Sequence, residues 1–291
     1  MPGQEHAHHA RGEMNIPVTA VILTYNEATN IRRCLGCLSW AQDIVIVDSF
    51  SEDDTLELAQ RARRDCRVFQ HEFTGFGDQR NWALDNVEPR FDWVLFLDAD
   101  EFCTDEVAGE IAEFIAEPGA AVGAYIAGKN YFLGRWLKHS TYYPSYQLRL
   151  LRHGEVRFRN EGHGQREVTD GELVYLRSEW RHEPFSKGVE QWIARHNRYS
   201  THEVALIERL RKHPLDLLEG LSADPIIRRR TIKRLAARAP LRPVVRFMYT
   251  YFLRFGFLDG YPGLLYCLLR VAHGIHIVAK LAEKRHGRGS E

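Results

Sequence analysis

Three short apolar segments, each ending in polar or acidic residues, constrain the fold of this chain most strongly. They comprise residues 18–24 (VTAVILT), 43–48 (DIVIVD) and 93–97 (WVLFL). Their apolar, β-branched composition is typical of strands that are buried on both faces. Helical spacing of apolar residues predicts helices at 29–38, 55–64 and 78–86, and a short strand is expected at 66–71. This alternation predicts an α/β fold with a mainly parallel central sheet flanked by helices.

Polar residues stand where ligands bind in such folds, at the carboxyl ends of the strands. Asp98 and Asp100, one residue apart, directly follow the segment 93–97. Two carboxylates in this arrangement can share a divalent cation and a sugar hydroxyl. Hard oxygen ligands suit Mg²⁺ or Mn²⁺, which usually take substrate phosphates as further ligands. The alternative is an acidic turn that only caps the next helix.

Asp48 ends the second predicted strand. A carboxylate at this position can accept a hydrogen bond from the N3–H of a uracil ring, a donor that a buried pocket must satisfy. Asp53 and Asp54 follow shortly afterwards and are expected to cap the helix that begins near Thr55. Base recognition is therefore assigned to Asp48 and capping to the other two carboxylates.

The composition excludes several classes of protein. Hydrophobic residues make up 44% of the 291 positions, which is too much for an intrinsically disordered chain. The formal net charge is zero, which argues against a globally basic nucleic-acid binder. The charges are unevenly distributed along the chain. Residues 223–291 carry fourteen Lys/Arg and four Asp/Glu, a net charge of +10, and residues 1–222 carry a net charge of −10.

The cysteines and the N-terminus indicate a cytoplasmic protein. Cys34 and Cys37 form a lone CxxC within a stretch of helical spacing, so buried small side chains are a better interpretation than a zinc or redox pair. Residues 1–13 lack the apolar core of a secretory signal, and residues 1–15 are expected to be a disordered leader. No uninterrupted apolar run reaches the ~18 residues of a membrane span.

Several motifs together resemble a known family. TYNE (24–27), VDSFSEDDT (47–55), GFGDQRNWAL (75–84) and DADE (98–101) are similar to motifs of the inverting glycosyltransferases of family two, which have the GT-A fold. NEGHG (160–164), HEPFSKG (182–188) and GFLDGYPGL (256–264) resemble the branch that includes bacterial lipopolysaccharide-core glucosyltransferases. The resemblance is strong over residues 18–101 and looser to residue 263. Glu52, Asp53 and Asp54 depart from the Thr-Asp-Gly of many relatives, which leaves the geometry of that turn open.

The resemblance implies an enzyme, a hexosyltransferase of class EC 2.4. It would move a hexose, expected to be glucose, from a UDP-sugar to a lipid-linked or lipopolysaccharide-core saccharide, with a single displacement that inverts the anomeric carbon. By the same resemblance, nucleotide-sugar contacts are assigned to Thr24, Tyr25 and Glu27 (uridine), Asp48 (uracil), Arg80 (diphosphate) and Asp98 (ribose or sugar), and Asp100 is assigned as the principal ligand of Mn²⁺ or Mg²⁺. A guanidinium suits diphosphate oxygens because it can form paired hydrogen bonds.

Glu161 occupies the region in which relatives place the catalytic base, and His163 is the competing candidate. A base of either type must reach the proton of the acceptor hydroxyl. For both residues a polar loop contact is the structural alternative. His182 resembles a third metal ligand or a diphosphate contact, and a structural histidine beside a proline turn remains the alternative.

The C-terminal region raises the question of a membrane partner. Arg270, His273, Lys280 and Lys284 form one polar stripe on an otherwise apolar helix. This pattern suits a helix lying in an anionic membrane interface, and the alternative is a helix packed on the catalytic domain or in a homo-oligomer. The predicted organisation is a leader (1–15), a GT-A catalytic domain (16–222) and a basic helical extension (223–291). The aromatic residues of the loop at 131–146 are assigned to the acceptor, with core packing as the alternative.

Two further hypotheses about the function stay open. A transferase of the same fold could act on polyprenyl phosphate, and a non-catalytic protein of this kind could bind nucleotides as a scaffold. The scaffold alternative predicts no metal-dependent transfer or hydrolysis of any nucleotide sugar. The favoured hypothesis, a hexosyltransferase, predicts a protein in the cytoplasm that lies peripherally on the inner face of the cytoplasmic membrane and has no nucleic-acid partner.

Overall fold

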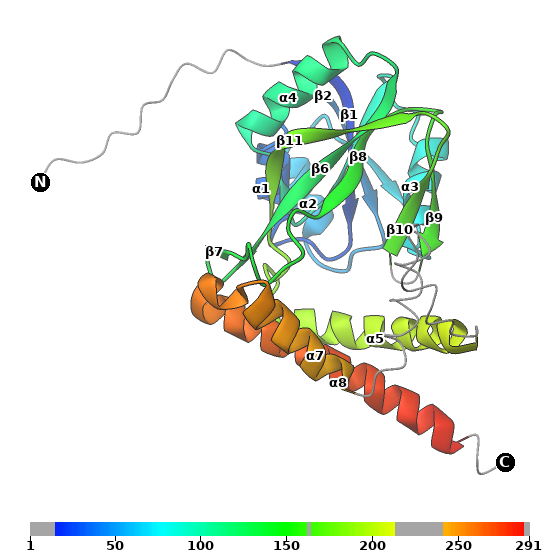
Figure 1. Ribbon diagram of the computed structural model, residues 1–291. Helices are drawn as coiled ribbons and strands as arrows, with labels where there is room; N and C mark the ends of the chain where they lie inside the picture. Colours follow the sequence, from blue (N-terminus) through cyan, green and yellow to red (C-terminus); the bar gives the residue numbers. More distant parts are fainter. Residues whose placement is uncertain (1–14, 162–163, 213–240, 288–291) are drawn as a thin grey trace, which may run out of the picture.

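A mixed β-sheet forms the centre of the protein (Figure 1). The computed structural model describes residues 15–161, 164–212 and 241–287. The strands are ordered β3-β2-β1-β4-β8-β6-β11-β5, with β7 paired to β6, and β9 and β10 form a separate hairpin. The strand bounds are β1 Ile16–Thr24, β2 Ala41–Asp48, β3 Arg67–Gln70, β4 Trp93–Asp98, β5 Glu101–Phe102, β6 Ala121–Phe132, β7 Arg135–Trp136, β8 Tyr146–Arg152, β9 Arg157–Glu161, β10 Gly164–Val168 and β11 Glu172–His182.

The first half of the sheet is parallel, as the alternation of strands and helices predicts. β3, β2, β1 and β4 all run in the same direction, whereas β8 runs antiparallel to both of its neighbours, β4 and β6. The helices are α1 Ile31–Gly36, α2 Thr55–Ala62, α3 Phe76–Asn86, α4 Asp105–Ala116, α5 Val189–Lys212, α7 Arg242–Phe247 and α8 Gly260–Gly287, with a π-helical turn η2 Met248–Leu253 and a 3₁₀ helix η3 Gly256–Asp259. The α/β fold and the order of its first elements are confirmed.

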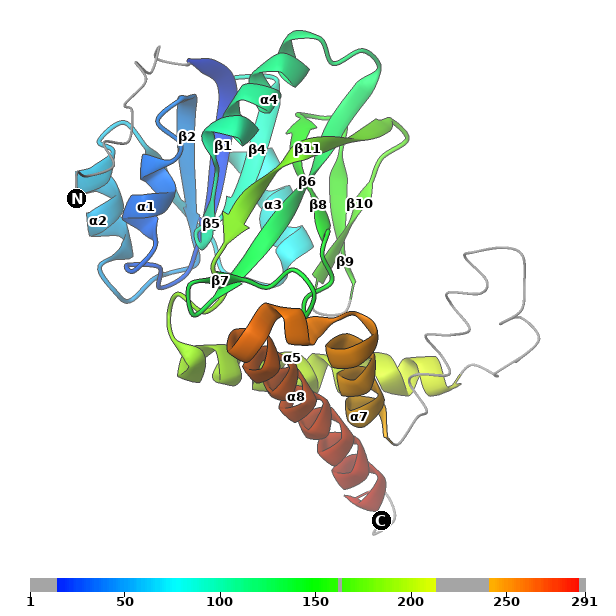
Figure 2. The same cartoon turned by 60° about the vertical axis from the view of Figure 1, so that its left-hand side comes forward.

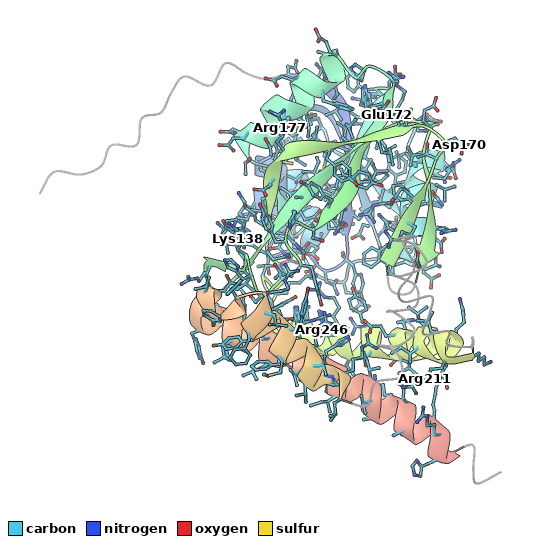
Figure 3. All side chains as sticks on the ribbon, in the orientation of Figure 1. Lys138, Asp170, Glu172, Arg177, Arg211 and Arg246 are labelled. Carbon is cyan, nitrogen blue, oxygen red and sulfur yellow. The ribbon has the colours of Figure 1, made fainter. Side chains whose placement is uncertain are left out.

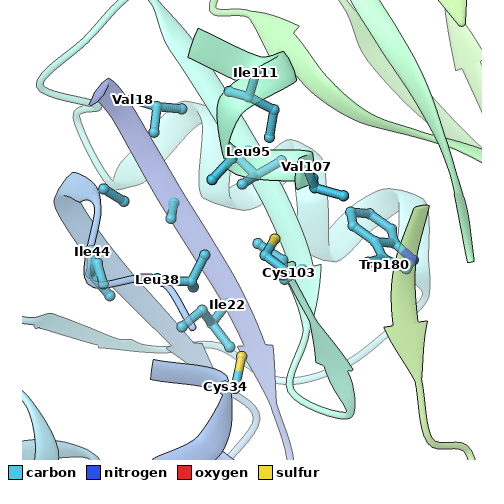
Figure 4. Packing of buried hydrophobic residues seen from close by; sticks show 14 of the residues in the cluster. Val18, Ile22, Cys34, Leu38, Ile44, Leu95, Cys103, Val107, Ile111 and Trp180 are labelled. Atoms are coloured by element: carbon cyan, nitrogen blue, oxygen red, sulfur yellow. The ribbon is translucent and has the colours of Figure 1, made fainter. Parts of the chain in front are cut away.

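Two apolar layers hold the sheet between helices. On one face, side chains from β1, β2 and β4 pack against α1, α2 and α4, and Figure 4 shows Ile22, Leu95 and Val107 in this core. On the other face, the alternate residues of the same strands, such as Val21 and Phe96, pack against α3. Full burial of one such aliphatic side chain stabilises the folded state by about 1.5–3 kcal/mol. Burial of both faces of the sheet explains why the sequences of these strands are continuous apolar runs.

The strand register brings the predicted polar residues to one edge of the sheet. Thr24 pairs with Asp48 across β1 and β2, and Leu23 pairs with Asp98 across β1 and β4. Figure 2 shows α5, α7 and α8 stacked as a separate layer below this edge, where the carboxyl ends of β1 and β4 point. The C-terminal helices therefore face the ligand-binding edge of the sheet.

The polar stripe of α8 faces the protein, which corrects the prediction that this stripe faces anionic lipid. His273 is buried at 3% exposure and contacts Glu203 and the backbone oxygen of His196, both on α5. Lys280 donates to Ser200 and to the backbone oxygen of Asn197, also on α5. The stripe contacts α5 because α5 supplies hydroxyl, carbonyl and carboxylate partners for it.

The segment Gly256–His286 is long and apolar enough, by length and composition alone, to cross a membrane. The count of charged residues along the sequence did not predict this. Only 22% of the most apolar part of that segment is buried within the described protein. Apolar surface of the C-terminal layer is therefore left uncovered by the described residues.

Candidate active site

Asp48 and the polar segment after β1 form one hydrogen-bonded unit. The Asp48 carboxylate is completely buried, accepts a hydrogen bond from Thr24 Oγ1 at 2.9 Å, and accepts another from the backbone N–H of Ser51 at 2.8 Å. Asn26 and Ser51 tie the two loops together, because the Asn26 N–H donates to Ser51 Oγ at 2.8 Å. Thr24 and Asp48 are thus brought together as the sequence suggests, and the uracil contact of Asp48 stays a prediction.

Asp98 is held by two buried arginines. Arg80 Nη2 donates to Asp98 Oδ1 at 3.1 Å and Arg149 Nη2 donates to Asp98 Oδ2 at 2.9 Å. Arg149 also donates to Glu101 Oε1 at 2.6 Å. Burial alone would raise the pKa of Asp98, but Arg149 and Arg80 hold that pKa well below its usual range. Asp98 is therefore an ionised acceptor of fixed orientation, with its side chain 30% exposed toward the site.

Arg80 is almost wholly buried, at 1% exposure. Besides Asp98 it donates to Gln165 Oε1 at 2.9 Å, which links α3 to the β9–β10 hairpin. In this geometry Arg80 orients Asp98, and a direct contact with the diphosphate stays a prediction. Burial lowers the pKa of Arg80 to about 10, so the guanidinium is charged at neutral pH.

Asp100 and His182 lie side by side at the edge of this network. His182 Nε2 is 3.6 Å from Asp100 Oδ2, and His182 Nδ1 is 2.8 Å from Asn130 Oδ1. Because an amide oxygen only accepts, Nδ1 carries the proton and Nε2 is directed toward Asp100. Burial alone would lower the pKa of His182, but Asp100 raises it, and His182 in turn lowers the pKa of Asp100 against the effect of burial.

This pair fits a divalent cation. A carboxylate oxygen and an imidazole nitrogen are both ligands of Mn²⁺-type ions, and a hydrogen bond from the other ring nitrogen to an acceptor such as Asn130 fixes the ring of a ligating histidine. Among the described residues no group of three or more His, Cys, Asp or Glu side chains could hold a metal by itself. The remaining ligands would be diphosphate oxygens and water, as is usual for Mg²⁺ in nucleotide sites. The donor set is therefore that of an ion shared with a substrate.

Tyr25 and Glu27 belong to a loop that a lysine fixes. Lys187 Nζ is 2.5 Å from Glu27 Oε1 and donates to the backbone oxygens of Tyr25 and Asn26 at 3.0 Å. Burial raises the pKa of Glu27, an effect that Lys187 partly offsets. The ring of Tyr25 is 52% exposed, so it is free to stack on a ligand.

The glycines of GFGDQRN make room for the NEGHG motif. Asn160 Oδ1 accepts from the Gly77 N–H at 2.9 Å, and Asn160 Nδ2 donates to Asp78 Oδ2 at 2.7 Å. A Cβ placed on Gly75 would lie 2.5 Å from the Asn160 side chain, and one on Gly77 would lie 2.9 Å from backbone of the hairpin. The two motifs are distant in sequence but form one contact, in which Asn160 closes the N-terminus of α3.

One candidate for the base, Glu161, lies on this hairpin. Glu161 ends β9, with its side chain 40% exposed, and lies 3.2 Å from Arg166 Nε. His163 lies outside the described residues. The hairpin reaches the Asp98 network through Gln165, next to Arg166, so Glu161 is carried on an element in contact with the site. Its role as base stays a prediction.

Sequence reasoning did not single out Arg149, Lys187 or Arg195. A signal exists for Arg149, because an arginine in the middle of the apolar strand β8 requires a buried acidic partner. Lys187 is part of the HEPFSKG motif but received no role. Arg195 on α5 lowers the pKa of Asp100 electrostatically, although burial of Asp100 has a larger, opposite effect. Arg195 is thus a further cation whose charge acts on Asp100.

Other assignments can be compared directly with the structure. Asp53 Oδ1 accepts from the Thr55 N–H at 3.1 Å, as a cap would, whereas Asp54 makes no side-chain cap hydrogen bond, so that part of the capping prediction is wrong. Cys34 is fully buried in the core, as predicted, and Cys37 Sγ accepts from the Cys103 N–H at 3.2 Å. In the aromatic loop, burial varies: Phe132 is buried, whereas Tyr142 and Tyr146 are 51% and 41% exposed.

Comparison with known proteins gives a family match over the catalytic sheet. The model described as "Glycosyl transferase family 2" matches residues 19–178, more than half of the chain. The lipopolysaccharide core biosynthesis glycosyltransferase LpsC of Rhizobium meliloti is 29% identical over 146 residues, covering 49% of this chain and 53% of that protein. The glycosyltransferase SunS of Bacillus subtilis is 29% identical over 98 residues, covering 33% of this chain and 23% of that protein.

These matches span about half the length of LpsC and about a quarter of SunS. Among solved structures, a mannosyltransferase from Pyrobaculum calidifontis in complex with GDP-Man and Mn²⁺ superposes with a TM-score of 0.50. That pair is 15% identical, and the superposition covers 92% of this chain and 87% of the other. At this identity the likeness concerns the fold, which is the GT-A fold.

Proposed function

Since this chain belongs to glycosyltransferase family 2, we propose that it transfers a hexose, glucose in the first instance, from a UDP-sugar to a lipid-linked or lipopolysaccharide-core saccharide. The transfer is metal-dependent and inverts the anomeric carbon. The observation that carries the proposal is the pairing of Asp100 with His182 beside an Asp98 that two arginines fix. The similarity to LpsC, a lipopolysaccharide core biosynthesis protein, supports the acceptor class.

The donor end of the site follows from the strand register. Asp48 and Thr24 at the ends of β2 and β1 receive the uracil and ribose, with Tyr25 stacking from the exposed loop. Asp98 accepts hydrogen bonds from ribose or sugar hydroxyls, because it is ionised and its orientation is fixed. Asp100 and His182 would hold a Mn²⁺ or Mg²⁺ ion, and that ion would supply positive charge to the diphosphate.

The charge that develops during transfer explains why these groups are needed. Breaking the bond between the anomeric carbon and the diphosphate builds negative charge on the phosphate oxygens, and a bound divalent cation supplies Lewis-acid stabilisation of that charge. Arg195 on α5 adds positive potential at Asp100. Glu161 or His163 accepts the proton of the acceptor hydroxyl as this oxygen attacks from the opposite face. A single displacement of this kind inverts the configuration.

The exposed apolar surface of the C-terminal layer supports the proposal of an acceptor at a membrane. Large apolar side chains are exposed on α7, η2, η3 and the start of α8, among them Leu253 at 72% and Tyr261 at 67%. Because the polar stripe of α8 contacts α5, the apolar surface of the layer faces outward. Residues 223–291, of which 241–287 are described, therefore dock the protein peripherally on the inner face of the cytoplasmic membrane.

A nucleotide-sugar panel tests the activity. The purified chain is incubated with UDP-glucose, UDP-N-acetylglucosamine, UDP-galactose and GDP-mannose, with Mn²⁺ or Mg²⁺ and with membrane extract as acceptor, and released nucleoside diphosphate is measured. Release from one UDP-sugar that requires the metal and falls by about 100-fold or more in Asp100→Asn supports the proposal. Asp170→Asn is the matched control, because Asp170 is exposed on the chain between β10 and β11. Metal-dependent release at the wild-type rate in Asp100→Asn would overturn the metal site.

Vesicle pelleting tests the membrane surface. Leu253→Ser with Tyr261→Ser removes two exposed apolar side chains of the layer, and Val168→Ser removes one, 50% exposed, from the distant hairpin. The double variant should pellet with anionic vesicles several-fold less than the wild type, because each exposed side chain that enters the lipid contributes on the order of 1 kcal/mol. Val168→Ser should pellet as the wild type does. If the wild type forms a dimer that persists on vesicles, and the double variant pellets as much as the wild type does, this surface would be assigned to a second copy of the chain.

A further inference from the structure

A narrow crevice lies between the loop after β7 and the helices of the C-terminal layer. It is lined by Ser140, Tyr142, Arg246, Phe247, Thr250, Tyr266, Cys267 and Arg270. Figure 3 labels Arg246 where α7 meets the lower end of the catalytic sheet. The family motifs do not include either arginine, and the activity proposed above uses neither.

Arg246 and Arg270 lie close together without an anionic partner in the described part of the chain. Arg270 makes no hydrogen bond or ion pair there, and its Nε is buried without a partner. Among the described residues Arg246 contacts the ring of Tyr142, with 5.6 Å between its guanidinium carbon and the ring centroid. Burial lowers the pKa of Arg246, and the neighbouring charge of Arg270 lowers it further. Two guanidinium groups held near each other in a partly buried crevice are unfavourable unless an anion joins them.

The nearby carboxylates are engaged elsewhere. Asp259 accepts hydrogen bonds from the backbone N–H groups of His139 and Ser140 and from Ser140 Oγ. Glu203 lies 3.4 Å from His273 and 3.9 Å from Arg242, and acts on Arg246 only weakly and through space. By contrast, Arg254, which also faces Tyr142, donates to the backbone oxygens of Thr141 and Tyr143. Arg246 and Arg270 are thus a pair of cations left for an external anion.

The crevice lies close to α5 on one side and to exposed apolar side chains on the other. Arg270 and His273 both lower the pKa of His196, in addition to the larger effect of burial, and Arg195 adjoins His196 and acts on Asp100. On the other side, apolar side chains near Arg246 are exposed, with Val245 of α7 at 61% and Met248 of η2 at 50%. The Arg246 end of the crevice therefore lies beside the apolar surface of the layer.

We propose that the Arg246–Arg270 crevice binds a phosphate group carried on a lipid, and so holds a phosphorylated acceptor at the membrane surface. Two guanidinium forks match the oxygens of a phosphate monoester, and the Thr250 hydroxyl adds a donor. The part of the inference that names the acceptor rests on the function proposed above. The binding of lipid phosphate does not, and it is measured separately.

Vesicle binding measures the preference for a phosphate monoester. Vesicles of phosphatidylcholine contain about one-fifth of either phosphatidic acid, which presents a phosphate monoester, or phosphatidylserine, which presents a diester of similar charge. The wild type should bind the phosphatidic acid vesicles about ten-fold more tightly, as one or two charge-assisted hydrogen bonds allow. Arg246→Gln and Arg270→Gln should each lose this preference and keep the binding to phosphatidylserine. Arg285→Gln, an equal change of charge at an exposed position of α8, should retain it.

Thermal unfolding separates a binding role from a structural role. Because the two cations repel each other, Arg270→Gln should keep or raise the Tm of the wild type, whereas loss of a structural arginine would lower it. Binding of UDP with Mn²⁺ should be unchanged in both variants, so a failure of the transferase proposal would leave this result intact. Equal binding of the wild type to the two vesicle types, or a preference retained in both variants, would overturn the inference. If inorganic phosphate raises the Tm of the wild type alone while vesicles show no preference, the crevice takes free phosphate and the lipid assignment is wrong.

Discussion

Replacement of Arg149 by methionine is the most informative perturbation of the site. Arg149 is fully buried and bonds both Asp98 Oδ2 and Glu101 Oε1. Without it Asp98 keeps Arg80, but the one hydrogen bond that Glu101 keeps within the described residues is from the backbone N–H of Asp98, at 3.0 Å. Removing one partner of a buried ion pair costs about 3–5 kcal/mol, because the remaining carboxyl must stay charged without compensation or take up a proton. Burial raises the pKa of Glu101 to about 7 even though Arg149 lowers it. Arg149→Met should therefore lower the free energy of unfolding by about this amount.

A double-mutant cycle isolates the cause. If the loss comes from the uncompensated Glu101 carboxylate, Arg149→Met with Glu101→Gln should be more stable than Arg149→Met alone by about 2 kcal/mol. Urea unfolding followed by circular dichroism at neutral pH measures each corner of the cycle. Arg152→Met is the control on the same strand, because Arg152 has no carboxylate partner among the described residues and contacts only the ring of Trp93. A cost near that of the control, or a double variant less stable than Arg149→Met, would refute the reasoning.

Three other changes follow from the contacts described. Lys187→Met should raise the KM for the nucleotide sugar several-fold with little change of kcat, because Lys187 fixes the position of the Tyr25 loop and does not fix the position of a reacting atom. Steady-state kinetics would contradict this prediction if kcat fell instead. Asn160→Ala should destabilise the protein by about 1–2 kcal/mol through loss of the Gly77 N–H contact, measured by urea unfolding, and an unchanged midpoint would count against it. Burial lowers the pKa of His196 to about 3, below its unfolded value, so the stability that this shift contributes is present above pH 6.5 and is lost as the pH falls toward 3. His196→Gln should flatten this pH dependence in unfolding curves recorded between pH 7.5 and 5. A variant as acid-sensitive as the wild type would show the assignment to be wrong.

The sequence predicts the first half of the fold well because local pattern and burial agree there. The run WVLFL is apolar since β4 is covered by helices on both faces, and the acidic residues that follow it stand at the edge where strands end. The predicted strands at 18–24 and 43–48 differ from β1 and β2 by only two residues at their starts. Periodicity carries this information without knowledge of tertiary contacts.

The second half depends on contacts that no local pattern records. Arg270, His273, Lys280 and Lys284 form one polar stripe in the sequence. His273, Lys280 and Lys284 face α5 because Glu203, Ser200 and Glu208 supply partners, whereas Arg270 lines the crevice beside Arg246. Likewise, the sequence suggests that the guanidinium of Arg80 is free to bind a ligand, whereas in the structure it donates hydrogen bonds to Asp98 and Gln165. Spacing shows which residues share a face and leaves open what that face contacts.

The central claim is that Asp100, aided by His182, holds the metal that joins the nucleotide diphosphate to the protein. Isothermal titration of UDP into the wild type, with and without Mn²⁺, tests it directly. We expect UDP to bind the wild type at least ten-fold more tightly with Mn²⁺ than without, and we expect this difference to vanish in Asp100→Asn and persist in Asp170→Asn. Binding of UDP to Asp100→Asn that still strengthens with Mn²⁺ as it does in the wild type would contradict the account.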